Sequence, residues 1–167
     1  QTVKSETIAG FNSYVDTLRD GENKQVTFTL IKFNSQKIET VCSHVAVADV
    51  PPLTTQNYLP NHYTPLYDAV GRAIRKAEGM LNGADAVFVV QTDGEENASK
   101  EFTQAAIKSL VEEKQKTGWV FVFLGAAQDA WTAASTIGIG AANTMSYDQT
   151  AKGVRGAMGQ IASSTLS

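Results

Sequence analysis

The stretch AVFVVQTDGEEN, Ala86–Asn97, decides the fold, because it joins a wholly apolar run to a turn rich in carboxylates. A short, continuous apolar run is typical of a β-strand that is buried on both faces of a parallel sheet. The same pattern recurs in WVFVFL, Trp119–Leu124. Helical spacing before and after both runs indicates strands that alternate with amphipathic helices. The sequence therefore predicts an α/β fold with a mostly parallel sheet.

The spacing of apolar residues and the positions of turn residues predict the other elements. Apolar residues three and four positions apart predict helices over 2–19, 65–81, 99–116 and 129–137. Runs of apolar, β-branched and aromatic residues predict strands over 25–33, 37–48, 86–90, 119–124 and 144–147, the first two antiparallel. The proline-rich segment 50–63 is expected to be a loop, and 149–167 a weakly ordered helix or tail.

The size and composition of the chain limit the classes of protein to which it can belong. The chain has 167 residues, 43% apolar and 19% charged, which suits a single globular domain with its own core. The net charge of −3 disfavours nucleic acid as a partner, and no apolar run approaches the roughly 20 residues of a membrane-spanning helix. Cys42 is the only cysteine and no signal peptide is visible, which favours the cytoplasm without excluding export. Gln1 indicates an internal, processed or trimmed start.

Oxygen-bearing side chains gather where parallel strands are expected to end, which is where open α/β sheets bind ligands. Asp93 follows the apolar run, and Thr64 stands at the start of a predicted helix. A hydroxyl and a carboxylate, completed by water, suit a hard cation such as Mg²⁺. Each residue also has a purely structural interpretation. Thr64 is a good N-cap before Pro65, Asp93-Gly94 suits a turn, and Glu95-Glu96 can be solvated acids at a helix start.

Two segments in this order, HYTPLYDAVGRAI (62–74) and VFVVQTDGEEN (87–97), resemble the von Willebrand factor A-type domain, especially its compact bacterial and phage-type members. The resemblance extends to segments 7–21, 26–35 and 119–139. It implies a Rossmann-like, doubly wound, mostly parallel sheet with one antiparallel strand and helices on both faces. It also implies a metal-ion-dependent adhesion site, in which the family's threonine matches Thr64 and its aspartate matches Asp93.

The sequence departs from this family at its first motif. The family's Asp-x-Ser-x-Ser ends a central first strand, and both would lie upstream of Gln1. We therefore expect a chain that lacks that strand and binds Mg²⁺, Mn²⁺ or Ca²⁺ weakly or not at all. Neighbouring strands lie about 4.8 Å apart, so the missing strand would leave a gap of roughly 10 Å. A strand donated by another chain could fill it.

The resemblance implies a protein-binding module rather than an enzyme, in which a carboxylate of the protein ligand completes the Mg²⁺ site. Tyr58, His62, Tyr63 and Glu95 are the residues that we expect at the rim of this site. One alternative is a structural or assembly protein with a vestigial metal site. Another is a Mg²⁺-dependent phosphoryl-transfer hydrolase, although the predicted strand ends offer no paired carboxylates and no convincing general base.

Overall fold

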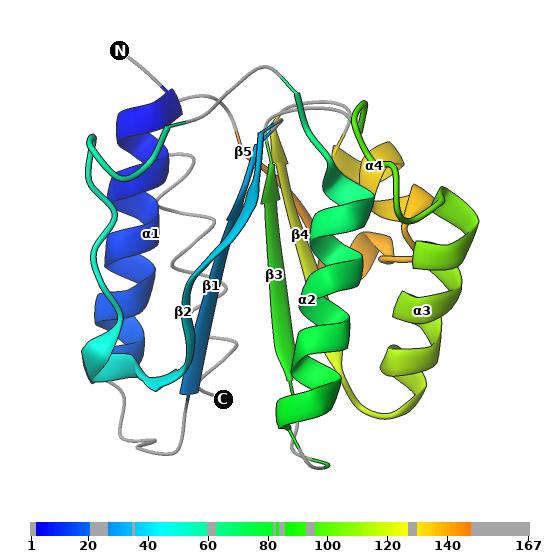
Figure 1. Ribbon diagram of the computed structural model, residues 1–167, viewed down its shortest axis with the longest axis horizontal. Helices are drawn as coiled ribbons and strands as arrows, with labels where there is room; N and C mark the ends of the chain where they lie inside the picture. Colours follow the sequence, from blue (N-terminus) through cyan, green and yellow to red (C-terminus); the bar gives the residue numbers. More distant parts are fainter. Residues whose placement is uncertain are drawn as a thin grey trace. The chain divides into compact units, whose positions relative to one another are not determined.

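A computed structural model describes residues 3–20, 27–34, 36–59, 63–81, 83, 86–92, 96–126 and 130–147. In chain order these form α1 (Val3–Asp20), β1 (Thr27–Phe33), β2 (Ile38–Ala46), η1 (Val47–Asp49), α2 (Leu66–Met80), β3 (Val87–Thr92), α3 (Gln104–Lys116), β4 (Val120–Ala126), α4 (Ala130–Thr136), η3 (Ala141–Asn143) and β5 (Thr144–Tyr147) (Figure 1). The predicted α/β class is confirmed. The tail predicted over 149–167 lies outside the described residues.

The strands form two small sheets. β1 and β2 make a two-stranded antiparallel sheet, and the second sheet has the order β3-β4-β5. β3 and β4 run parallel, with Val87 opposite Val120 and Thr92 opposite Gly125. Among the described residues no hydrogen-bonded pairing joins β1 or β2 to β3, so one continuous doubly wound sheet is not confirmed. The short strand predicted over 144–147 is confirmed as the edge strand β5.

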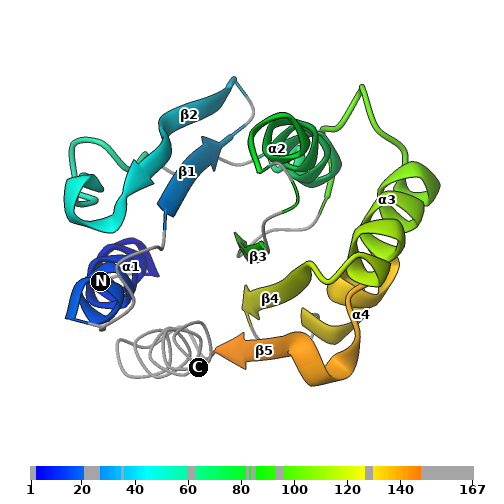
Figure 2. The same ribbon diagram turned by 90° about the horizontal axis from the view of Figure 1, so that it is seen from below.

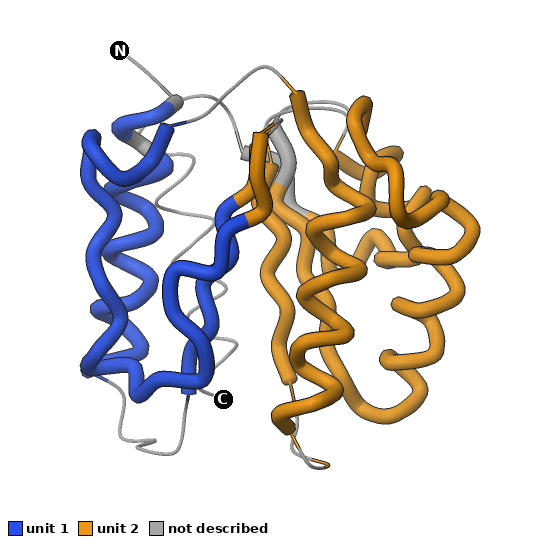
Figure 3. The backbone as a smooth tube through the Cα atoms, in the orientation of Figure 1, with its two compact units in different colours: residues 1–32, 39–60, 147–167 blue, residues 33–38, 61–146 orange. Residues whose placement is uncertain are grey.

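The chain divides into two compact units, which are described here one at a time (Figure 3). Unit 1 comprises residues 1–32, 39–60 and 147–167, and unit 2 comprises 33–38 and 61–146. Within the described residues, no helix of either unit is long and apolar enough to cross a membrane.

In unit 1, α1 uses one apolar face for packing. Phe11, Val15 and Leu18 are buried as their helical spacing predicts. The Phe28 ring of β1 lies 6.0 Å from the Phe11 ring in an edge-to-face arrangement. Aromatic pairs of this geometry add about 0.5–1.5 kcal/mol to the free energy gained from burial alone. The Phe28 ring therefore contributes to holding the hairpin against α1.

Side chains of α1 also hold the loop that follows β2. The guanidinium of Arg19 donates to the carbonyl oxygens of Val47 at 3.2 Å and Val50 at 2.7 Å. The amide of Asn12 donates to the Leu53 carbonyl and accepts from the Leu53 N–H, both at 2.9 Å. The loop thus satisfies its backbone groups with helix side chains, as a loop without regular structure must.

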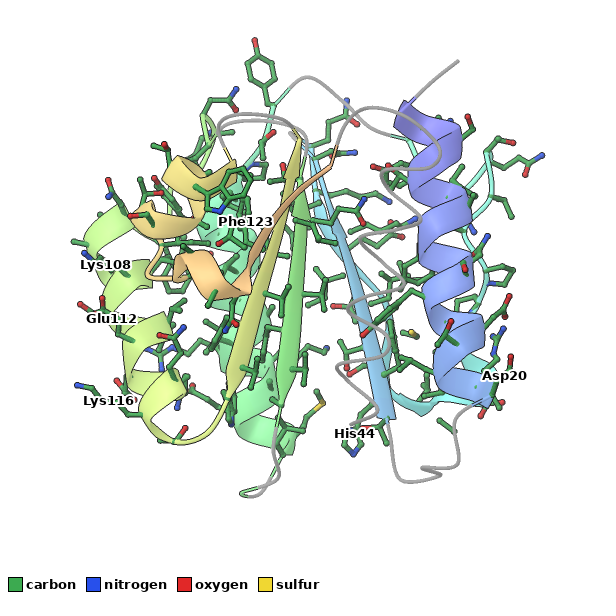
Figure 4. All side chains as sticks on the ribbon, turned by 180° about the vertical axis from the view of Figure 1, so that it is seen from behind. Asp20, His44, Lys108, Glu112, Lys116 and Phe123 are labelled. Atoms are coloured by element: carbon green, nitrogen blue, oxygen red, sulfur yellow. The ribbon has the colours of Figure 1, made fainter. Side chains whose placement is uncertain are left out.

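The main apolar cluster of unit 2 lies on one face of its parallel sheet. Alternate residues of β3 (Phe88, Val90) and β4 (Phe121, Phe123) face the same way, as the two-residue period of a strand requires. Figure 2 shows α2, α3 and α4 grouped beside this sheet, and Phe123, labelled in Figure 4, is fully buried. The helices contribute the following buried residues: Leu66, Val70, Ile74, Ile107, Leu110, Val111, Ala130 and Ala134.

The predicted start of α3 at Ser99 is wrong, since the helix begins at Gln104. Thr103 is the N-cap, and its hydroxyl accepts from the Ala106 N–H at 3.2 Å. The residues before it are held in a loop by contacts with α2, which are described below. The predicted end is confirmed, because the chain turns at Thr117-Gly118 with Gly118 at φ +95°.

Candidate functional site

The structure describes only part of the predicted metal site. Thr64 lies two residues before α2, separated from it by Pro65, and α2 begins at the same end of unit 2 at which β3 finishes (Figure 1). Asp93 comes immediately after β3 in the sequence and, like Glu95 and His62, lies outside the described residues. Tyr63 is 58% exposed beside Thr64. Tyr58, the fourth predicted rim residue, belongs to unit 1.

Thr64 is joined to the loop after β3 by a reciprocal pair of hydrogen bonds. Its backbone N–H donates to the Oδ1 atom of Asn97 at 2.8 Å. The backbone N–H of Asn97 donates in return to the Thr64 carbonyl at 3.2 Å. The two residues are 33 positions apart in the sequence, so this contact is a product of the fold. It brings the threonine loop and the loop after β3 together, as the predicted site requires.

The first turn of α2 is capped from this same loop. The Tyr67 N–H donates to a carboxylate oxygen of Glu96, and the Asp68 N–H donates to the Ser99 hydroxyl, both at 3.0 Å. These are two of the backbone donors that every helix start leaves unsatisfied. The prediction that Thr64 is the N-cap is wrong, because Pro65 occupies the cap position and the N–H groups of Tyr67 and Asp68 are bound by Glu96 and Ser99. Capping therefore does not account for the Thr64 hydroxyl.

Glu96 has a structural role that its sequence context did not indicate. Its carboxylate also accepts from the N–H groups of Ala98 at 3.0 Å and Ser99 at 2.7 Å, and from the Ser99 hydroxyl at 2.8 Å. The interpretation of Glu96 as a solvated acid at a helix start is therefore wrong. The side chain is half-buried, and α3 begins only at Gln104. Its oxygens are committed to protein donors.

Asp68 holds the next part of the loop. The residue is 6% exposed, and its carboxylate accepts from the backbone N–H groups of Lys100 at 2.9 Å, Glu101 at 3.0 Å and Phe102 at 2.9 Å. Burial tends to raise the pKa of Asp68. The three backbone hydrogen bonds and the nearby Arg72 outweigh burial and lower it below its ordinary value. Asp68 is therefore an ionised structural anchor, which sequence reasoning missed.

Tyr67 links the same region to α4. Its hydroxyl is hydrogen-bonded to the side chain of Thr136. Burial raises the pKa of Tyr67, the neighbouring Glu96 carboxylate adds to this effect, and the Thr136 bond only partly opposes it. The phenol consequently stays neutral and serves as a hydrogen-bonding group between the two helices.

The arrangement separates oxygens that hold the fold from oxygens that could bind a ligand. The carboxylates of Asp68 and Glu96 are bound by backbone donors, which makes them poor candidates for a metal. Among the described residues no group of three or more histidine, cysteine or acidic side chains could hold an ion. The Thr64 hydroxyl is not used as the N-cap of α2, and its residue is bonded to Asn97 in the loop after β3, so it stays a candidate oxygen for a hard cation.

Comparison with models of known protein families gave no match, and comparison with curated proteins found none similar to this chain. The resemblance to the von Willebrand factor A-type domain accordingly rests on the residues quoted above. What it implies about metal and ligand is developed below as a proposal.

Proposed function

We propose that this chain is a metal-ion-dependent protein-binding module of the von Willebrand factor A type. A Mg²⁺ ion, or Mn²⁺ or Ca²⁺ in its place, is coordinated by the Thr64 hydroxyl and the Asp93 carboxylate. Water and a carboxylate from the protein ligand supply further oxygens, which suits a cation that keeps part of its hydration shell. The finer fold proposed with this function is a Rossmann-like doubly wound sheet with helices on both faces.

The observation that carries the proposal is the reciprocal pair of hydrogen bonds between Thr64 and Asn97. It ties Thr64 to the loop in which Asp93 lies, four residues before Asn97 in the sequence. The capping of α2 by Glu96 and Ser99 supports the same conclusion, because the Thr64 hydroxyl is then not needed as the N-cap. Tyr63, exposed beside Thr64, is available as a contact residue of the rim.

Affinity for metal is expected to be weak, because the sequence contains no Asp-x-Ser-x-Ser. Two protein oxygens hold a hydrated Mg²⁺ ion less well than the family's three loops would. We expect a dissociation constant on the order of 1 mM, equivalent to about −4 kcal/mol. Submicromolar binding of Mg²⁺ to this chain alone would contradict this part of the proposal.

Titration calorimetry with Mg²⁺ and Mn²⁺ tests the site. Thr64→Ala and Asp93→Ala should each weaken binding at least tenfold. Thr103→Ala is the matched control for the threonine, since it removes a hydroxyl that caps α3, and Asp16→Ala removes an exposed acid. Equal affinity in the wild type and in Asp93→Ala would reject the assignment. Capture of a protein ligand should likewise be lost in Asp93→Ala and in the presence of chelator.

A structural or assembly role, with a vestigial metal site, is the second candidate. It is favoured by β3, whose apolar run Val87–Val90 lies at the edge of its sheet in the described part of the chain. Such runs are typical of interior strands, and an open edge can accept a strand from another chain. Amide hydrogen exchange of β3 at increasing protein concentration tests this role, because strand donation between chains would raise protection. A phosphatase screen addresses the hydrolase alternative.

A further inference from the structure

Asn97 occupies a position that no helix cap or core contact requires. Asn97 is exposed, and its neighbours Glu96 and Ser99 accept from the Tyr67 and Asp68 N–H groups in the first turn of α2. The described partner of its Oδ1 atom outside its own loop is the backbone of Thr64. We infer that Asn97 is a positioning residue, which fixes the direction of the Thr64 side chain toward a bound divalent cation. This inference rests on the proposed function.

The geometry supports positioning because Asn97 engages Thr64 at two points. The N–H and the carbonyl of Thr64 are bound at 2.8 Å and 3.2 Å respectively. A single hydrogen bond would leave the Thr64 backbone free to rotate about that bond. Two bonds on opposite sides of the Cα atom fix the orientation of the backbone, and with it the direction of the Cα–Cβ bond that carries the hydroxyl.

The chain on either side of this contact restricts it further. Thr64 precedes Pro65, and a residue before proline is confined largely to extended backbone conformations. Asn97 lies between Glu96 and Ser99, both of which are bonded to α2. Each residue is therefore held by its own neighbours. If the hydrogen bond from the Thr64 N–H is lost, a shift of Thr64 or Asn97 is not expected to restore it. Partners that hydrogen-bond a ligating group commonly change metal affinity by about 10–100-fold, and we expect a partner of the ligand's backbone to fall at the lower end of that range.

Three variants of the whole chain separate positioning from general stability. Asn97→Ala removes the acceptor of the Thr64 N–H, whereas Asn97→Asp keeps an oxygen at that place. Lys100→Gln is the charge control, because it lowers the net charge by one, as Asn97→Asp does. The Lys100 side chain is exposed, and its bond to Asp68 uses the backbone N–H.

Mn²⁺ binding, followed by calorimetry and by the electron paramagnetic resonance signal of free Mn²⁺, is the first readout. Asn97→Ala should bind Mn²⁺ with an affinity at least about tenfold lower than that of the wild type. The Mn²⁺ affinity of Asn97→Asp should remain within about threefold of that of Lys100→Gln, because the aspartate keeps an acceptor oxygen for the Thr64 N–H. Equal affinity of wild type and Asn97→Ala, or equal losses in Asn97→Ala and Asn97→Asp, would overturn the inference.

Hydrogen exchange of the Thr64 amide is the second readout, and it needs no metal. Exchange should be protected in the wild type and in Asn97→Asp, and faster in Asn97→Ala. Unchanged Thr64 protection in Asn97→Ala overturns the positioning role even if metal binds. Failure of the wild type to bind Mn²⁺, with Thr64 protection lost in Asn97→Ala, rejects the proposed metal site instead and leaves Asn97 with a purely structural contact.

Discussion

Replacing Asp68 with alanine should destabilise unit 2 more than any exposed acid of the chain would. The change removes three hydrogen bonds to a buried carboxylate and leaves the N–H groups of Lys100, Glu101 and Phe102 without that acceptor. Hydrogen bonds to charged groups contribute about 1.5–3 kcal/mol each. Lys100 and Glu101 are exposed, so water can replace part of the loss. We therefore expect a loss of about 3 kcal/mol in unfolding free energy, or about 1 kcal/mol per bond.

Urea unfolding followed by tryptophan fluorescence is a suitable assay, because Trp119 and Trp131 both lie in unit 2. Asp68→Asn should lose about half as much, because the amide retains one acceptor oxygen but no charge. Glu113→Ala is the matched control within unit 2, since it removes an exposed acid beside Lys114 and should cost less than about 0.5 kcal/mol. The reasoning is refuted if Asp68→Ala loses less than about 1 kcal/mol, or no more than Glu113→Ala.

Two further predictions concern the same region. Gly71→Ala should destabilise by about 1–3 kcal/mol, because the added Cβ would lie 2.6 Å from the Phe102 ring. Gly79→Ala on the same helix meets no atom within 4 Å and should stabilise by about 0.5–1 kcal/mol, so equal effects in urea unfolding would contradict the contact. Because the pKa of Asp68 is lowered on folding, its contribution is present above about pH 4 and is lost as pH falls through the folded-state value. The gap in stability between wild type and Asp68→Asn should narrow from pH 4 downward, and a constant gap would count against this role.

The sequence predicted the elements well where the pattern within a single segment determines them. The apolar face of α1, the apolar runs of β3 and β4 and the turn at Thr117-Gly118 depend on residues a few positions apart. The start of α3 and the capping of α2 were predicted less well, because distant partners determine them. α2 is capped by residues about 30 positions later, and Asp68 holds residues 100–102 outside α3. No local pattern shows such contacts.

The same limit applies to the candidate site. Thr64 could be chosen from its position before a predicted helix, although the capping role expected there was wrong. Asn97, Ser99 and Asp68 were missed, because each looks like an ordinary loop or first-turn residue in its own segment. A weak signal was available for Asp68, since an acid in the first turn favours the helix dipole. That signal does not reveal a carboxylate that binds three backbone groups of another loop.

The dependence of α2 on the loop after β3 also bears on how unit 2 folds. A helix start whose caps are supplied about 30 residues later cannot be completed until that stretch of chain has been closed into a loop, which costs entropy before any bond is gained. The isolated sequence of α2 would be a poor helix for the same reason, despite its clear apolar face. Formation of the first turn of α2 and ordering of residues 96–102 are therefore expected to be one kinetic event, and its rate depends on the pairing of distant segments rather than on helix propensity.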